Sequence, residues 1–356
     1  MQIGGLCLEK TTSNKKNMTL EYIRALSTIA VVSIHTVNSG IIYSGDDALH
    51  ALVAFFLAIK NIIYWAVPCF LMITGYLLLN PEKSVPIKKL FGKYILRMVL
   101  VLATFGAAFS WIEIFFDEKY FAPVQILQTY GNILTGNTWA HLWYVYTLIG
   151  LYLFLPLYRA VAKCASDKEL LYLVAVIFFF QTVLPVFEHF TGYALGFSVH
   201  IAAVFPLYLL LGEVRRRRIV SMERKTAWIV FSVSSLLIAV LSMFQVFADL
   251  DLSVLFGYSS PLTVIMAYAL FCIFEYTTLP SGGVKEKIIR EISLKSFAIY
   301  IIHMFFVNIE YQFLHLRLLD NIAASMLILV LIVVNLWVSY IVAWIMKKIP
   351  VLNKLL

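Results

Sequence analysis

Residues 20–40 read LEYIRALSTIAVVSIHTVNSG, an apolar run that contains Arg24 and His35. About 20 predominantly apolar residues cross a hydrocarbon core about 30 Å thick. An arginine at the middle of such a helix costs roughly 2.5–3.5 kcal/mol on insertion scales, so ionisable residues are rare there unless they have a function. Arg24 and His35 are eleven positions apart, close to three helical turns, which places them on one face about 16 Å apart. Glu21 precedes Arg24 by three positions and can share that face. The stretch predicts a membrane helix with a polar stripe that ends in His35.

Apolar runs of similar length recur along the whole chain, which is 62% hydrophobic and only 13% charged. This composition excludes a soluble globular protein and predicts an all-α, polytopic membrane helix bundle of about ten transmembrane helices. The predicted spans are residues 20–41, 56–79, 94–116, 140–160, 169–187, 197–214, 227–247, 255–277, 294–314 and 322–346. The expected organisation is a segment at 1–19, one transmembrane domain over 20–348 and a tail at 349–356, without an appended soluble enzyme.

Basic residues mark one side of this arrangement. With these spans, 25 of the 28 lysines and arginines fall on one side of the membrane, and the opposite connections carry acids. An excess of lysine and arginine marks the cytoplasmic side, so both termini are predicted to be cytoplasmic. The net charge of +8 is therefore interpreted as a topology signal and not as a sign of nucleic-acid binding. The four cysteines show no paired spacing, so neither a disulfide framework nor a metal site is predicted.

His35 and Arg24 are the first candidates for a functional site. A histidine with a pKa near neutrality suits a general base that takes a proton from a hydroxyl. The alternative is a histidine that holds the bundle together through an interhelical hydrogen bond. Arg24 can anchor a phosphate or carboxylate through two parallel hydrogen bonds, or it is neutralised by Glu21 or reaches the cytoplasmic surface.

Residues 88–97, KKLFGKYILR, place four basic residues where the third predicted span leaves the cytoplasm. Lys93 and Arg97 are four positions apart and lie on one helical face, with Lys89 four positions earlier. They are candidates to bind a polyanionic cofactor such as coenzyme A. Contact with lipid headgroups is the simpler explanation of the charge alone. The run Arg215–Arg218 is interpreted as a topology anchor.

The outer start of the fourth predicted span carries a cluster of aromatic residues. Trp139, Trp143 and Tyr144 are typical of an aromatic belt at the membrane surface. His141 lies among them. A sugar-binding surface also combines aromatic rings with a hydrogen-bonding neighbour, so both interpretations stay open.

The ninth predicted span carries a second polar stripe. Ser296, Tyr300 and His303 fall at i, i+4 and i+7, and Glu310 extends the stripe by seven positions. His303 is expected near the middle of the membrane, where an unpaired polar group is costly. A role in the site and a structural interhelical hydrogen bond remain alternatives. Lys60 and Glu113 are expected near the outer boundary without a functional role.

Together these stretches resemble the acyltransferase 3 family of bacterial membrane O-acyltransferases over nearly the whole chain. The Glu21/Arg24 and His35 pattern resembles the family's first-helix arginine and histidine. The other three matching stretches are PCFLMITGYLL at 68–78, HLWYVYTLIGLYLFLP at 141–156 and SLKSFAIYIIH at 293–303. At the third span, Tyr94 stands three positions before Arg97, where the family often has a second arginine, and the family's following proline is absent.

The resemblance implies transfer of an acyl group, usually acetyl, from cytoplasmic acyl-coenzyme A to a hydroxyl of a surface or lipid-linked glycan. It implies a multi-pass protein of a bacterial cell membrane, without a metal and with the oligomeric state open. The implied catalytic residues are His35, Arg24 and Glu21, and the donor contacts are Lys89, Lys93 and Arg97. The auxiliary or acceptor-binding candidates are His141, Trp143, Tyr144, Ser296, Tyr300 and His303.

Two other functions fit part of the pattern. Intramembrane ionisable residues also mark transport routes, so a ten-span exporter or flippase for a glycan precursor is the main alternative. The halves of the chain show no convincing similarity, whereas a repeated half would have favoured a transporter. A regulatory domain that binds the acyl donor without turnover is the third interpretation.

Overall fold

The computed structural model describes residues 3–118, 122–196, 203–275 and 283–356, and within them the chain is helical without any β-strand. The α-helices are α1 (Ile3–Ile42), α2 (His50–Ile62), α3 (Ala66–Leu78), α4 (Ile87–Lys89), α5 (Leu96–Val101), α6 (Ala107–Glu118), α7 (Pro123–Thr135), α8 (Trp143–Leu153), α9 (Leu155–Cys164), α10 (Asp167–Phe178), α11 (Leu184–Thr191), α12 (Phe205–Arg217), α13 (Arg224–Ala248), α14 (Pro261–Glu275), α15 (Val284–Asn308), α16 (Ile322–Met346) and α17 (Pro350–Leu355). Short 3-10 turns are η1 (Ile63–Trp65), η4 (Ala140–Leu142) and η6 (Ser253–Leu255). Turns of π-helix are η2 (Leu90–Ile95), η3 (Leu102–Gly106), η5 (Phe179–Val183) and η7 (Ile309–Phe313).

Seven helical segments of the described chain are long and apolar enough to cross a membrane. They are Met18–Ile42, His50–Leu78, Ile87–Phe116, Asp167–Thr191, Arg224–Ala248, Val284–Phe313 and Ile322–Met346. The pair Ala140–Leu153 and Leu155–Cys164, bent by 53°, forms an eighth if it is one span. The remaining two predicted spans correspond to the shorter helices α14, of 15 residues, and α12, of 13 residues, and residues 197–202 of the predicted 197–214 span lie outside the described residues. The prediction of an all-α chain with several membrane helices is confirmed, whereas the number ten stays a prediction.

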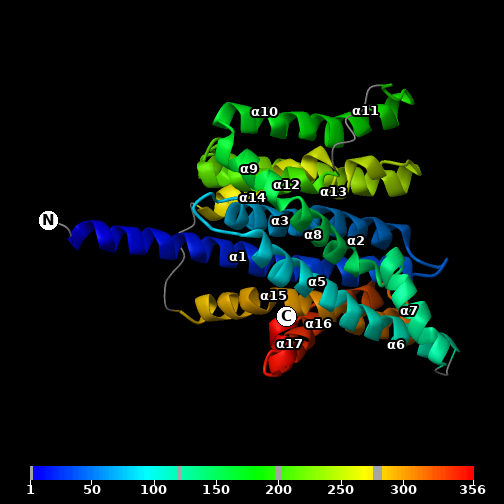
Figure 1. Cartoon of the computed structure of the whole chain (residues 1–356). Helices are drawn as coiled ribbons and strands as arrows, with labels where there is room; N and C mark the ends of the chain where they lie inside the picture. Colours follow the sequence, from blue (N-terminus) through cyan, green and yellow to red (C-terminus); the bar gives the residue numbers. More distant parts are fainter. Residues whose placement is uncertain (1–2, 119–121, 197–202, 276–282) are drawn as a thin grey trace.

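The helices divide into an inner and an outer group. Over an apolar stretch of 18 residues, 61% of the residues are buried in the spans that contain α1, α2–α3 and α15, against 22% in those that contain α10, α13 and α16. Helix α1 packs against α15, α3, α16 and α2. Figure 1 shows α1 running through the bundle, with its N-terminal part extending beyond it. Because other helices surround α1, its polar stripe faces protein and not lipid.

Two glycines let α3 and α12 approach closely. A Cβ atom at Gly75 would lie 1.8 Å from the carbonyl oxygen of Leu209, and one at Gly212 would lie 2.1 Å from the carbonyl oxygen of Met72. Small residues at helix crossings allow such backbone contact in membranes, where packing replaces the hydrophobic effect. The Gly75 of the stretch at 68–78 therefore has a packing role.

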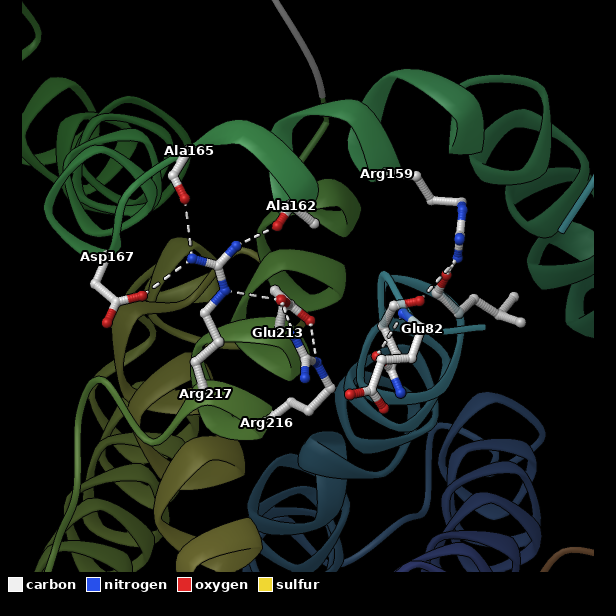
Figure 2. A network of polar contacts seen from close by, with 10 residues as sticks. Glu82, Arg159, Ala162, Ala165, Asp167, Glu213, Arg216 and Arg217 are labelled. Carbon is white, nitrogen blue, oxygen red and sulfur yellow. Dashed lines mark hydrogen bonds and ion pairs between the residues drawn. The ribbon is translucent and has the colours of Figure 1, made fainter. Parts of the chain in front are cut away.

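Arginines join the ends of α3, α9, α10 and α12 at one end of the bundle, here called the basic end (Figure 2). The end of α14 is joined to the same region by Arg215. The buried carboxylate of Glu213 accepts hydrogen bonds from Arg216, at 2.6 and 2.7 Å, and from Arg217, at 2.8 Å. Arg217 also binds Asp167 at 3.0 Å and donates to the carbonyl oxygens of Ala162 and Ala165. Arg217 thus satisfies carbonyl groups at the end of α9 that the helix leaves unpaired.

Arg159 and Arg215 have similar structural roles at the basic end. Arg159 donates to the carbonyl oxygens of Leu78, Asn80 and Lys83, which follow or end α3. Arg215 forms an ion pair with Glu275 at the end of α14. The basic run is consequently engaged in holding helix ends together, and its interpretation as a topology anchor stays a prediction.

Candidate active site

Three histidines from three separate parts of the chain meet inside the bundle. The ring of His35, on α1, lies 5.0 Å between centroids from that of His303, on α15, and 6.5 Å from that of His141, in η4. The His141 and His303 rings are 5.5 Å apart. Both His141 and His303 are completely buried, whereas His35 is partly exposed. We call these residues the histidine cluster.

Backbone carbonyl groups fix the protonation pattern of the two buried rings. Nδ1 of His303 is 2.7 Å from the carbonyl oxygen of Tyr300, and Nε2 of His141 is 3.2 Å from that of Ile301. A carbonyl oxygen only accepts hydrogen bonds, so each of these nitrogens carries a proton. When the rings are neutral, Nε2 of His303 and Nδ1 of His141 are therefore acceptors, and neither has a hydrogen-bond partner. The cluster offers two buried lone pairs that nothing in the described chain satisfies.

A polar cavity of about 440 Å³ opens beside His35. This volume is within the range of small-molecule binding sites, about 300–1,000 Å³. Its lining comes from the C-terminal parts of α1 and α15, the middle of α6, η7 and the segment around α7 and η4. In Figure 1, α7 and the C-terminal part of α1 lie at the end of the bundle opposite the start of α10. The described lining residues are His35, Asn38, Ser39, Ile42, Tyr43, Ser110, Glu113, Ile114, Asn132, Asn137, Thr138, Trp139, Ala140, Met304, Asn308 and Gln312.

Three polar residues at or beside the cavity are not among the predicted site residues. Glu113 and Lys60 were expected to have no functional role, and Asn38 was not a candidate. Glu113 is the one carboxylate among the described lining residues, and its Oε2 accepts a hydrogen bond from Nε1 of Trp139 at 2.9 Å. Lys60 donates to Oδ1 of Asn38 at 3.3 Å, which leaves the amide NH₂ of Asn38 free to donate elsewhere. Polar residues at the outer ends of three predicted spans were the available signal, but the sequence does not show that these ends converge.

Aromatic side chains lead from the histidine cluster towards Arg24. Tyr300 donates its hydroxyl to the carbonyl oxygen of His141, and its ring lies 5.9 Å from that of His303. The ring of Tyr144, on α8, is 5.5 Å from that of Tyr300. Tyr144 in turn is within electrostatic reach of Arg24. Tyr144 and Tyr300 therefore connect the two ends of the polar stripe on α1.

Glu21 lies away from the histidine cluster, at the start of the stripe. Its Oε2 is 3.3 Å from Nε of Arg290, on α15. No ion pair joins it to Arg24 in the described chain, although the two interact electrostatically. Glu21 is thus placed to link α1 to α15 and to influence Arg24 from a distance.

The three basic candidates of the third span have different surroundings. Arg97 donates to the carbonyl oxygens of Leu355, at 2.7 Å, and Leu356, at 2.8 Å, and lies 4.8 Å from the ring centroid of Phe297. Lys89 and Lys93 are exposed. The two lysines are consequently open to a ligand, whereas Arg97 is occupied by the C-terminal segment.

The other aromatic and polar candidates are not part of the cavity lining. Trp143 packs against Phe205 and Tyr258, with ring centroids 5.2 and 5.1 Å away. Ser296 is buried, one turn before Tyr300 on α15. Of the aromatic group near the start of α8, Trp139 lines the cavity, and it stacks on Phe109 with ring centroids 4.4 Å apart.

The fold and the site together define the class of protein. It is a helical, multi-pass membrane protein with a histidine cluster beside a polar cavity. The chain belongs to the acyltransferase 3 family, because the sequence model of that family, described as an acyltransferase domain, matches residues 18–344. The matched range begins at Met18 in α1 and ends at Trp344 in α16, so it includes the whole histidine cluster and the cavity. No curated protein and no solved structure matches the chain significantly. The prediction of family membership is confirmed.

Proposed function

We propose that this protein is a membrane O-acyltransferase that transfers an acyl group, acetyl in the simplest case, from acyl-coenzyme A to a hydroxyl of a glycan. The observation that carries the proposal is the position of His35, close to two buried histidines and at the wall of a polar cavity. Family membership supports acyl transfer as the reaction, and the amide and hydroxyl groups of the lining suit an acceptor with many hydroxyls.

The proposed topology places the basic end in the cytoplasm and the cavity on the outside of a bacterial cell membrane, with ten spans and both termini cytoplasmic. It is supported by the segregation of lysine and arginine, which marks the cytoplasmic side of membrane proteins. Acyl-coenzyme A is then bound from the basic end, where the exposed Lys89 and Lys93 are available to its phosphates. The thin pantetheine arm passes between helices along the line from Arg24 to Tyr300, so its charged nucleotide does not cross the membrane.

The proposed reaction uses His35 as a general base. His35 takes the proton of the acceptor hydroxyl while the hydroxyl oxygen attacks the thioester carbonyl, and the carbon–sulfur bond then breaks. The proton passes from His35 to the departing thiolate, which leaves as coenzyme A. The products are the glycan ester and coenzyme A, and His35 returns to its neutral state.

Asn38 is the proposed donor to the oxyanion that forms on the thioester oxygen. It follows His35 by three positions on α1 and lines the same cavity, and its amide oxygen is engaged by Lys60. Tyr300 is less suited to this role because its hydroxyl is bound to the His141 carbonyl oxygen. The free nitrogen of neutral His303 is an acceptor and not a donor.

An assay with radiolabelled acetyl-coenzyme A tests the reaction class on the purified protein. The protein is reconstituted with total glycan extracted from bacterial membranes, and both free coenzyme A and labelled glycan are followed over time. We expect the two products to appear together in equal amounts. A transporter would consume no donor, and a sensor would bind it without releasing coenzyme A, so either result would overturn the proposal.

A further inference from the structure

We propose that His303 is a positioning residue that accepts a hydrogen bond from His35 through Nε2 and thereby turns the basic nitrogen of His35 towards the cavity. The inference rests on the proposed function for its catalytic meaning, but its structural content can be tested without substrate. In serine hydrolases a carboxylate orients the catalytic histidine. Here a second imidazole, neutral and fixed by the backbone, occupies the corresponding place.

The first step of the argument is that His303 presents an acceptor and not a donor. Its Nδ1 is close to two carbonyl oxygens, those of Tyr300 at 2.7 Å and Ile299 at 3.2 Å. Both carbonyl groups accept, so the proton of the neutral ring is on Nδ1, and Nε2 has a free lone pair. That nitrogen is fully buried without a partner, and a buried unsatisfied polar atom costs about 1–3 kcal/mol.

The second step is that His35 is the side chain placed to satisfy this lone pair. The His35 and His303 rings are 5.0 Å apart between centroids and inclined by 50°. Ring nitrogens lie on the rim of an imidazole, so rings at this separation can form an ordinary N–H···N hydrogen bond of about 3 Å when one nitrogen of each ring points towards the other. No such bond is formed in the described conformation, and catalytic hydrogen bonds often tighten only when substrate is bound.

The third step is that a bond to His303 decides which nitrogen of His35 is basic. A neutral imidazole has one N–H and one acceptor nitrogen. If the N–H of His35 is directed at His303, the acceptor nitrogen of His35 is the other one, which is free to face the cavity. His141 offers a second acceptor, Nδ1, but its ring is farther from His35, at 6.5 Å. His303 is therefore the nearer of the two orienting groups.

Nitrogen NMR on protein labelled with ¹⁵N-histidine in nanodiscs tests the arrangement directly. The chain has 7 histidines, and single substitutions assign the signals, with the exposed His189 as the reference for a residue outside the cluster. At a pH where the rings are neutral, we expect His303 protonated on Nδ1 only and His35 in a single tautomer. In H303L, His35 should populate both tautomers. Nε2-protonated His303 in the unmodified protein, or an unchanged His35 signal in H303L, would overturn the inference.

Kinetics with H303L and H303Q separate positioning from a structural role. The amide oxygen of glutamine can accept a hydrogen bond, whereas leucine cannot. We expect H303L to lower kcat about 10- to 100-fold, less than the roughly 10²–10⁴-fold that general acid–base catalysis supplies, because His35 itself is still present. The KM for acetyl-coenzyme A should change less than about twofold. H303Q should recover most of the lost kcat. Equal losses in both variants would contradict the orienting role, whereas activity retained in a His35 variant would instead contradict the proposed function.

Discussion

The hydroxyl of Tyr300, on α15, donates a hydrogen bond to the main-chain carbonyl oxygen of His141, in the turn before α8. His141 returns a bond from Nε2 to the carbonyl oxygen of Ile301. These two bonds join the start of α8 to the middle of α15. They thereby hold His141 close to His303 within the histidine cluster. Because the contact is buried, both partners depend on it for satisfaction.

Y300F should therefore lower stability and turnover together. Loss of the hydroxyl removes a buried hydrogen bond to the His141 carbonyl oxygen, which costs about 1–3 kcal/mol. The matched control is Y268F, which removes another buried tyrosine bond, from Tyr268 to the carbonyl oxygen of Val220 at 2.6 Å, beside Arg215 at the basic end. Thermal unfolding in detergent should show a similar loss for both variants, while acetyl transfer should fall markedly only in Y300F. Equal transfer rates in the two variants would contradict the placement of Tyr300 in the site.

G75A tests the crossing of α3 and α12. The added methyl group would meet the Leu209 carbonyl oxygen at 1.8 Å, so the helices must separate, and overpacking of this kind typically costs about 1–3 kcal/mol. The control is G150A on α8, where an added Cβ has no atom of the described chain within 4 Å. Size-exclusion chromatography and thermal unfolding should show that G75A is destabilised and G150A is not. A G75A protein of unchanged stability would refute the close crossing.

N38A should reduce kcat without a comparable change in either KM. Removing one oxyanion donor typically lowers kcat by about 10²–10³-fold. The comparison variant is K60M, which keeps the amide of Asn38 but removes the lysine that engages its oxygen. We expect an intermediate loss in K60M, because the amide is then free to rotate. An N38A enzyme with full kcat in the labelled acetyl-coenzyme A assay would exclude the oxyanion role.

E113Q addresses the acceptor end of the site. Glutamine keeps an oxygen that can accept from Nε1 of Trp139 but removes the negative charge from the cavity wall. We expect the KM for the glycan acceptor to rise several-fold, with the KM for acetyl-coenzyme A unchanged, because the donor enters from the basic end. If E113Q changed only the KM for acetyl-coenzyme A, the cavity would bind the donor and not the glycan acceptor, which would contradict the proposal.

K93Q addresses the donor end. Lys93 is exposed and, like Arg159 of the basic end, interacts electrostatically with Lys83. An exposed phosphate contact is screened by salt. We expect a KM for acetyl-coenzyme A that is raised several-fold at low ionic strength and less raised at high ionic strength, with kcat unaffected. R97Q should instead loosen the C-terminal segment, since Arg97 binds the carbonyl oxygens of Leu355 and Leu356. If only R97Q alters the donor KM, the assignment of Lys93 is refuted.

The membrane character and the family of the chain could be predicted from the sequence, because both depend on local patterns. Long apolar runs identify spans through their length alone, and Arg24 and His35 are exceptional within residues 20–40 on the grounds of energetic cost. The number of spans could not be settled in this way. α12 and α14 are short, and the two predicted spans that contain them include residues outside the described part of the chain.

The composition of the site depends on contacts between distant segments, which periodicity does not encode. His35, His141 and His303 were each candidates, but their convergence follows from the packing of α1, η4 and α15. Glu113 was expected to have no role, because a carboxylate at the end of a span is unexceptional until the cavity beside it is known. The spacing of Arg97 to Lys93 predicts a contact with the acyl donor, and no sequence pattern indicates the bonds of Arg97 to the C-terminal segment.

The most direct test of the whole account is the surface glycan of cells that carry H35A in place of the unmodified protein. Membrane fractionation first shows that the variant is present in the membrane at a normal level, and NMR of the purified glycan then measures its ester groups. The account predicts that the acyl ester is lost with H35A and restored by the unmodified protein. A glycan that keeps its full ester content in the H35A strain would contradict the assignment of His35 as the catalytic base.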